Sequence, residues 1–126
     1  GAAAGIANLK LIDSLGLVAN AGETGAYFSA ALRDALGGHP NVGEVRGEGM
    51  IAAVELVEDR DDRRFFDPAK KAGWSVANAL LGEGVIARAM PHSDVIGFAP
   101  PLCLTRAEAD IIVDAAVKAV KKGLGA

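Results

Sequence analysis

The chain has 126 residues and a formal net charge of -3, with 51% hydrophobic and 23% charged residues. A chain of this length and apolar content can bury about two-thirds of its surface in one core, so we expect a single domain over residues 1–126. The negative charge argues against nucleic acid as a partner. Without a long apolar run or a signal-peptide pattern, we expect no membrane association and a cytoplasmic location.

Two helices are predicted to lead the chain, over residues 1–38. Apolar residues at three-residue steps predict an amphipathic helix from Ala2 to Leu15, and a second apolar stripe predicts a helix from Leu17 to Leu36. Gly37 and Gly38 should end that helix. The sequence opens in this helical pattern without an initiator methionine. We therefore expect the chain to be a piece of a longer protein.

Two glycines lie inside the second predicted helix. Gly22 and Gly25 each cost on the order of 1 kcal/mol relative to alanine in a helix interior. A cost of that size predicts that another part of the chain packs closely against the helix at these two positions.

The period of the apolar pattern changes after the second helix. Residues 42–46 are typical of a short strand and residues 47–49 of a bend. Met50 to Val57 is a nearly continuous apolar strand, which predicts a central position in a sheet. The following residues 58–64, EDRDDRR, alternate in charge and predict a solvated loop.

A third helix is predicted to begin at Asp67-Pro68 and to continue to Leu81. An aspartate can accept hydrogen bonds from the first free amides of a helix, and proline lacks the amide that would be wasted there. The residues of this helix that are expected to point into the core are Trp74, Ala77, Leu80 and Leu81.

The stretch from Gly84 to Thr105 follows the third helix. It is predicted to begin as an apolar strand that ends at Arg88, to turn between Pro91 and Asp94, and to return as the strand Val95 to Phe98. A last helix should start with the capping box Thr105–Glu108, in which the two side chains satisfy free amides.

The order of these elements predicts the fold class. Helix, helix, strand, strand, helix, strand, strand, helix favours an α+β fold. We expect residues 1–38 to form leading helices and residues 42–126 to form an αβ layer. That layer would be an antiparallel or mixed sheet of three to four strands with helices on one face.

Several motifs that could carry chemistry favour a structural role. The patterns Gly47-x-Gly49-x-x-Ala52 and Gly82-x-Gly84-x-x-Ala87 resemble a dinucleotide-binding turn, but each leads into a predicted strand instead of a helix. His39 and His92 have no cysteine or carboxylate at metal-ligand spacing, so we predict no metal site. Cys103, the only cysteine, lies between two leucines and is expected to be a buried apolar residue.

Arg88 is the strongest candidate for a binding residue. A guanidinium at the tip of an apolar strand is always charged, and it can hold a carboxylate through two parallel hydrogen bonds. The alternative is an exposed arginine at a strand end, or an ion pair with a residue such as Glu55. The residue pattern alone leaves both interpretations open.

Four segments, in this order, resemble the C-terminal part of the class III aminotransferases. They are residues 1–18, GAAAGIANLKLIDSLGLV; residues 45–56, VRGEGMIAAVEL; residues 84–90, GVIARAM; and residues 98–105, FAPPLCLT. This class contains the omega-amino acid and amine:pyruvate transaminases, which depend on pyridoxal phosphate. The resemblance implies the small C-terminal domain of a fold-type-I enzyme, closing over a cofactor that a larger domain holds.

The resemblance also implies roles for single residues. Arg88 matches the position of a mobile arginine that binds the substrate carboxylate in amine:pyruvate-type enzymes, and the adjacent segment Pro91–Ser93 suits such motion. The Schiff-base lysine, the aspartate at the pyridine nitrogen and the phosphate-binding turn of this class all lie N-terminal to the matched region. We therefore assign no catalytic residue in this chain, and no catalytic role to any of its lysines: Lys10, Lys70, Lys71, Lys118, Lys121 and Lys122.

These implications lead to an expected function. The complete protein would be a homodimeric omega-transaminase that moves an amino group from an amine or omega-amino acid to pyruvate or a similar keto acid, with pyridoxal phosphate as the electron sink. The chain alone would bind no cofactor and would be inactive. The alternatives are a free-standing, non-catalytic binding or assembly domain, and another class III aminotransferase of the ornithine or semialdehyde type.

Overall fold

A computed structural model describes residues 1–91 and 94–125 of the chain, and these residues form an α+β fold, as predicted. Four strands make one antiparallel sheet in the order β1-β2-β4-β3. The elements, in chain order, are α1 (Ala2–Ser14), α2 (Leu17–Leu36), β1 (Val42–Glu48), β2 (Ile51–Leu56), the 3-10 helix η1 (Pro68–Lys70), α3 (Ala72–Gly82), β3 (Arg88–Ala89), β4 (Val95–Phe98) and α4 (Arg106–Leu124).

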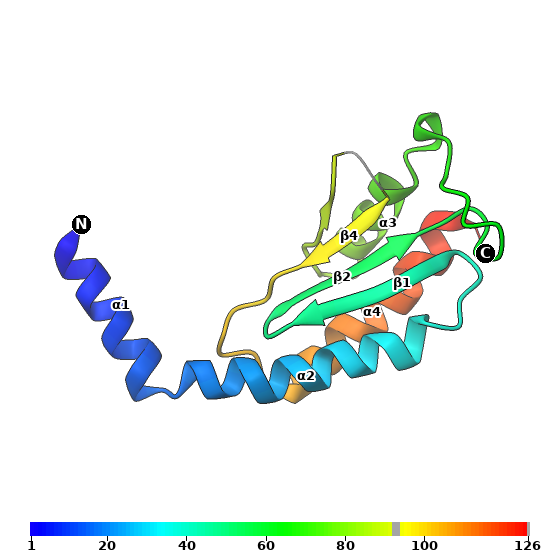
Figure 1. Ribbon diagram of the computed structural model, residues 1–126. Coiled ribbons are helices and arrows are strands. Elements are labelled where there is room, and N and C mark those ends of the chain that lie inside the picture. The colour runs from blue at the N-terminus through cyan, green and yellow to red at the C-terminus, as the bar shows by residue number, and fades with distance from the viewer. Residues whose placement is uncertain (92–93, 126) are drawn as a thin grey trace.

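Helices α2, α3 and α4 cover one face of the sheet, which confirms the predicted helices on one face (Figure 1). Helix α2, expected among the leading helices of residues 1–38, contributes Phe28, Leu32 and Leu36 to the core of this layer. β2 lies in the interior of the sheet, as its apolar pattern predicted. Its side chains alternate between the two faces: Ala52, Val54 and Leu56 are buried under the helices, whereas Ile51 is exposed. The sheet is therefore buried on one face only.

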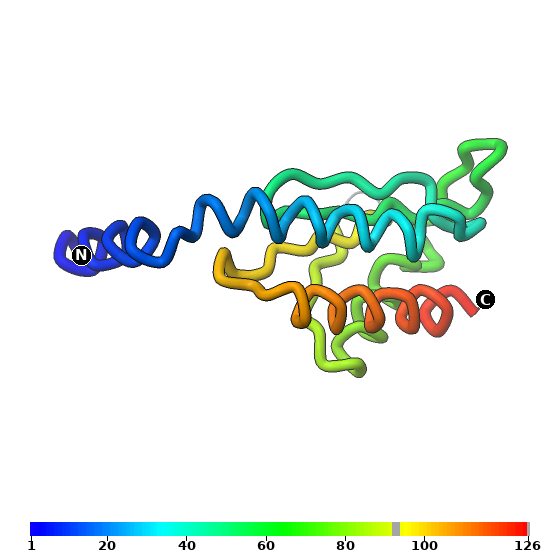
Figure 2. Tube along the Cα trace, turned by 90° about the horizontal axis from the view of Figure 1, so that it is seen from below, coloured from blue at the N-terminus to red at the C-terminus, as the bar shows by residue number. Residues whose placement is uncertain are grey.

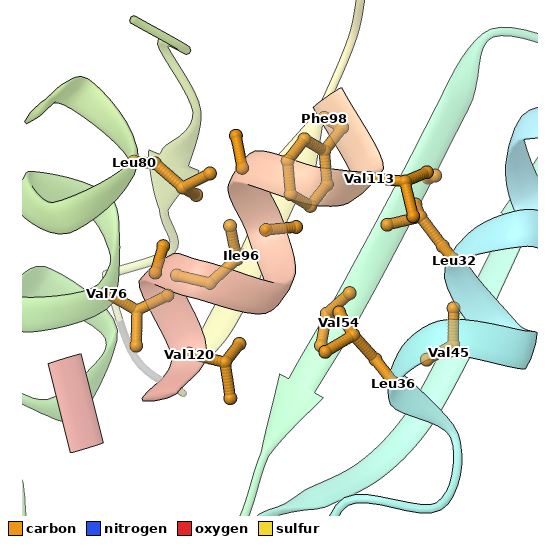
Figure 3. Close-up of a cluster of buried hydrophobic side chains, with 14 of the residues drawn as sticks. Leu32, Leu36, Val45, Val54, Val76, Leu80, Ile96, Phe98, Val113 and Val120 are labelled. Atoms are coloured by element: carbon orange, nitrogen blue, oxygen red, sulfur yellow. The ribbon is translucent and has the colours of Figure 1, made fainter. Parts of the chain in front are cut away.

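One contiguous cluster of apolar side chains fills the space between the sheet and the helices. Figure 3 shows Leu32 of α2, Val54 of β2 and Ile96 of β4 pointing into this cluster together with side chains of α3 and α4. The rings of Phe28 and Phe98 meet edge to face with centroids 6.0 Å apart. Burial of each large apolar side chain contributes about 1.5–3 kcal/mol.

Helix α1 stands apart from this core. It projects from the body of the molecule and is bent by 61° relative to α2 (Figures 1 and 2). None of its residues is buried, although Ile6, Leu9 and Leu11 are apolar. Within the described chain no single helix reaches the length and apolarity of a membrane span, whereas α1 and α2 meet that criterion when they are taken together.

The third helix begins later than the sequence predicts. The side chain of Asp67 accepts a hydrogen bond from a backbone amide at 2.9 Å, as expected of a cap, but it caps only the short helix η1. Lys71 then adopts φ 49, which separates η1 from α3. Trp74 and Leu81, predicted to point inward, are 62% and 60% exposed. The residues that α3 buries instead are Ala72, Gly73, Val76, Ala79 and Leu80.

Cys103 is exposed, so the prediction that it is buried is wrong. The Leu104 amide donates to the Pro101 carbonyl at 3.0 Å, forming a tight turn in which Leu104 alone enters the core. The side-chain amide of Asn20 on α2 holds this turn, because it donates to the carbonyls of Leu102 and Leu104 at 2.6 and 3.0 Å.

Helix α4 starts as predicted. The Thr105 hydroxyl accepts a hydrogen bond from the Glu108 amide at 3.3 Å, and the Glu108 carboxylate accepts one from the Thr105 amide at 2.8 Å. The Thr105 amide and the Thr105 hydroxyl both donate to the Glu108 carboxylate, and these two bonds lower the pKa of Glu108. A local pattern of four residues was therefore enough to predict this helix start.

The hairpin of β1 and β2 packs closely against α2. β1 continues to Glu48, beyond the predicted strand end, and the chain reverses through Gly49–Met50, with Gly49 at φ 54. A Cβ atom added at Gly25 would lie 2.0 Å from the Gly49 carbonyl oxygen, so the predicted close packing occurs there. No described atom lies within 4 Å of a Cβ added at Gly22, and the same prediction is wrong at that position.

Replacement of Gly25 by alanine should lower the free energy of unfolding by about 1–3 kcal/mol, because the new methyl group forces the hairpin away from α2. The matched control is Gly22→Ala in the same helix, which should raise that free energy by up to about 1 kcal/mol. Urea denaturation followed by circular dichroism measures both changes. Similar effects of the two substitutions would contradict the close contact at Gly25.

Candidate functional site

Arg88 is the first residue of β3, a two-residue strand at the edge of the sheet. It pairs with Gly97 of β4. The predicted strand that ends at Arg88 is therefore wrong in its extent. The Val85 amide donates to the Leu80 carbonyl of α3 at 2.9 Å, which holds the preceding segment to the helix. The chain joins the sheet only at Arg88.

The side chain of Arg88 lies on the side of β3 away from the core. Its neighbours Ala87 and Ala89 pack against the core cluster, and successive side chains of a strand point to opposite faces. Arg88 is exposed. Among the carboxylates of residues 1–91 and 94–125, none lies within ion-pair distance of its guanidinium.

Glu55 forms an ion pair with Arg46. From the sequence, Arg88 was a possible partner of Glu55. The Arg46 guanidinium lies 3.0 Å from the Glu55 carboxylate and 2.8 Å from that of Glu44. The hydrogen bond to Glu55 raises the pKa of Arg46. The predicted alternative, an ion pair between Arg88 and Glu55, is therefore not formed.

A groove of about 790 Å³ lies beside Arg88, between α3 and the edge formed by β3 and β4. Arg88 is the one charged residue among its described lining residues, and most of the others are apolar. A second groove of about 910 Å³ adjoins it and shares Trp74 and Asn78 with it. Lys71 and Asp94 line this second groove.

Asp94 connects the elements that surround these grooves. Its side-chain Oδ1 accepts a hydrogen bond from the Gly73 amide at 2.9 Å, which satisfies a free amide at the start of α3. Its carbonyl accepts a bond from the Leu56 amide at 2.6 Å, at the end of β2. Next to it, the Met90 amide donates to the Val95 carbonyl at 2.9 Å and links β3 with β4. Asp94 therefore fixes α3 relative to the strands beside Arg88.

The remaining sequence candidates have structural roles or lie outside this site. Gly49 and Gly84 are followed by strands or loop, not by a helix, as predicted. The ring of His39 accepts a bond from the Asn41 amide at 3.1 Å, and burial lowers the pKa of His39. In the described part of the chain, no three His, Cys, Asp or Glu side chains are placed to hold a metal ion. His92 and Ser93, part of the predicted mobile segment, lie outside the described residues.

The family is shown by a sequence profile. The profile of class III aminotransferases matches residues 1–120. The chain belongs to the class III aminotransferases. Among the curated relatives of this class III chain, the diaminobutyrate–2-oxoglutarate transaminase of Halomonas elongata is 52% identical over 97% of the chain and 26% of that protein. An uncharacterised aminotransferase of Sinorhizobium fredii is 49% identical over 96% of the chain and 26% of that protein.

Solved transaminase structures share the fold of this class III chain. A structure from work on directed evolution of transaminases by ancestral reconstruction has a TM-score of 0.96 and 53% identity, over 98% of this chain and 27% of that chain. An (S)-enantioselective omega-transaminase from Thermomicrobium roseum has a TM-score of 0.87 and 35% identity, over 94% of this chain and 26% of that chain. The class III chain thus spans about a quarter of the length of its relatives.

The class depends on pyridoxal phosphate, but the described residues do not fit a binding site for that cofactor. A Schiff-base lysine reacts as a neutral amine and is usually desolvated in a pocket. All the lysines of this class III chain are exposed, and two are held in ion pairs, Lys70 with Glu58 and Lys118 with Glu83. Lys71 lines the second groove at its exposed surface. No catalytic step through the cofactor follows from these residues.

Sequence reasoning missed that Trp74 and Asn78 line the groove of Arg88 and that Asp94 caps α3 beside the second groove. The apolar residues of α3 fit two helical stripes, one with Trp74 inward and one with Val76 and Leu80 inward, and the sequence gives no choice between them. Asp94 bonds to a residue 21 positions away, and no local pattern reveals such a contact.

Substitution of Asp94 by alanine should lower the free energy of unfolding by about 0.5–2 kcal/mol, because the Gly73 amide loses its cap. Asp94→Asn keeps an acceptor oxygen and should lose less than half of that amount. The control is Asp62→Ala in the exposed charged loop, which should stay within about 0.5 kcal/mol of the unmodified chain. Thermal unfolding followed by calorimetry compares the three variants, and equal losses for Asp94→Ala and Asp62→Ala would exclude the capping role.

Proposed function

We propose that the chain is the small C-terminal domain of a pyridoxal-phosphate-dependent transaminase, in which Arg88 binds the carboxylate of the substrate. One observation carries the proposal. In a chain of this class, the arginine that matches the family's carboxylate-binding position is exposed, is not paired with a described carboxylate and lies at a groove without acidic lining residues.

The position of Arg88 suits a carboxylate-binding role. A guanidinium grips a carboxylate through two parallel hydrogen bonds, which fixes the orientation of the substrate as well as its affinity. β3 has a strand on one side only and contains two residues, so few contacts restrain the Arg88 side chain. The guanidinium is free to bind a carboxylate, or to turn to solvent when an amine donor without a carboxylate is bound.

The reaction would transfer an amino group from an amine or omega-amino acid to a keto acid such as pyruvate. The cofactor and the catalytic lysine would come from the larger part of the complete protein, which would act as a homodimer. In this division of roles, Arg88 orients the substrate. It neither forms nor breaks a covalent bond. It lowers the barrier by holding the reacting groups in place.

A second acceptor is favoured by the comparison with relatives. The Halomonas elongata relative, which is named for diaminobutyrate and 2-oxoglutarate, is 52% identical to this chain. The omega-transaminase from Thermomicrobium roseum is 35% identical. Pyruvate and 2-oxoglutarate both carry a carboxylate next to the keto group, so Arg88 would serve in either case. A panel of amino donors and keto acid acceptors, tested with the complete protein, shows whether pyruvate or 2-oxoglutarate is the acceptor. The same panel distinguishes an omega-transaminase from an aminotransferase of the ornithine or semialdehyde type.

In the complete protein, Arg88→Ala should raise the KM for pyruvate or alanine by about one to three orders of magnitude, which corresponds to about 1.5–4 kcal/mol of lost charge-assisted bonding. Half-reactions with amine donors that lack a carboxylate should be nearly unchanged. Arg88→Lys keeps the charge but loses the paired hydrogen bonds. Its KM for pyruvate or alanine should lie between that of the unmodified protein and that of Arg88→Ala. Stopped-flow half-reactions measure each substrate separately, and equal losses for both donor types would refute the carboxylate role.

With one equivalent of pyridoxal phosphate, the purified chain should form no tight stoichiometric adduct, because its exposed lysines lie outside a desolvated pocket. Added cofactor should give no absorption band that borohydride fixes to the chain. Co-expression with the remaining part of the protein should restore both the band and transaminase activity. A fixed adduct on the chain alone would contradict this division of roles. Failure of complementation by a folded remaining part would favour the free-standing, non-catalytic domain.

A further inference from the structure

The turn between α2 and β1 is joined to the far end of β2 through Asn41. The side-chain amide of Asn41 donates hydrogen bonds to the carbonyls of Val57 and Glu58, both at 3.1 Å. The backbone carbonyl of Asn41 accepts a further bond from the Val57 amide at 2.9 Å. Asn41 therefore connects the start of β1 with the segment that leaves β2 for the charged loop.

The ring of His39 holds the backbone of Asn41 in place. His39 is half-buried, and its ring Nδ1 accepts a hydrogen bond from the Asn41 amide at 3.1 Å. The backbone of His39 bonds on both sides, to the Leu36 carbonyl at 2.9 Å and to the Val42 amide at 3.0 Å. A ring nitrogen accepts a hydrogen bond only while it carries no proton. The bond to Asn41 therefore requires the neutral imidazole, with its proton on Nε2.

The cations around this turn oppose a second proton on the ring. Burial and the charge of Lys121 on α4 lower the pKa of His39 below its ordinary value of 6.5. Arg60 of the charged loop donates to the Gly37 carbonyl at 2.5 Å, directly before the turn. Arg33 lies in the last turn of α2. Three elements thus each bring a cation to this end of the molecule.

The carboxylates give no compensation. Glu58 belongs to the segment that Asn41 binds, but its carboxylate is engaged in ion pairs with Arg64 and Lys70. In the part of the chain that the structure describes, no carboxylate lies within ion-pair distance of the His39 ring. A protonated ring would therefore lose its hydrogen bond to Asn41 and gain no described anionic partner.

We propose that His39 is a pH-sensitive switch: the neutral ring holds the turn between α2 and β1, and protonation releases the Asn41 amide and loosens the connection from Asn41 to Val57. The proposal is independent of the role of Arg88. The unfolded chain contains an ordinary histidine, whereas the folded chain disfavours the protonated ring. The stability that this contact contributes is therefore fully present above about pH 6.5 and is lost as the pH falls through that value towards the lower pKa of the folded chain.

Amide hydrogen exchange of the 126-residue chain, followed by NMR at steps between about pH 7.5 and pH 5, tests the switch. After correction for the intrinsic exchange rate, the protection of the Asn41 and Val57 amides should fall by about two- to tenfold, as expected for the loss of one hydrogen bond. The fall should follow the protonation curve of the His39 ring. The reference is the Val85 amide, which donates to the Leu80 carbonyl and should keep its protection.

His39→Asn is the matched variant. An asparagine oxygen can accept a hydrogen bond from the amide two residues further on, as in an Asx turn, and it does not titrate in this range. This variant should keep the protection of the Asn41 and Val57 amides at all pH values. Lys121→Gln should raise the midpoint of the His39 ring titration, because one opposing charge is removed, and the neighbouring Lys122→Gln should raise it less.

Three results would overturn the proposal. One is a ring titration of His39 with its midpoint at or above pH 6.5, the ordinary value. Another is constant protection of the Asn41 and Val57 amides while the ring becomes protonated. The third is the same pH dependence of protection in His39→Asn as in the unmodified chain. The first two need no variant, so they decide the question even if His39→Asn does not fold.

Discussion

One-sided burial of the sheet is the constraint on which the rest of this structure depends. Helices α2, α3 and α4 all lie on one face, and the core between them and the sheet buries alternate residues of the interior strand β2. Glycine allows close contacts in this arrangement: a Cβ atom would lie 2.0 Å from the Gly49 carbonyl oxygen at Gly25 of α2, and 2.8 Å from Val76 of α3 at Gly123 of α4. Because the apolar face is used up in this way, charged residues of the strands, such as Arg46 and Arg88, remain on the accessible side.

The candidate site lies at the edge of the sheet, at strand β3. A strand at an edge is paired on one side only, and β3 is so short that Arg88 has few neighbours. Asp94 restrains the backbone near this edge, because it accepts hydrogen bonds from the start of α3 and from the end of β2. The backbone around Arg88 is thereby fixed while its side chain stays accessible. An arginine so placed can recognise a carboxylate without taking part in bond making.

The proposed function divides the roles between this chain and the larger part of the complete protein. The class III match shows the chemistry of the class, and the chain spans about a quarter of its relatives. All the lysines of this chain are exposed, and the proposed function therefore takes the reacting lysine from the larger part of the complete protein. In the proposed function, the contribution of this chain is to bind the substrate carboxylate through Arg88. The exposed apolar residues Ile6 and Leu9 of α1 show in addition that the core of this chain does not cover all of its apolar surface.

The sequence by itself determined whatever depends on neighbouring residues. The bounds of α2, the capping box Thr105–Glu108 and the cap at Asp67 all follow from side chains within a few positions of one another. The four segments that resemble the class III aminotransferases were equally readable. Only the tertiary structure decided which stripe of α3 enters the core, where Arg88 joins the sheet and what surrounds it. Periodicity marks residues as apolar but does not say which face meets a partner, and contacts such as Gly73 with Asp94 form between residues far apart in the chain.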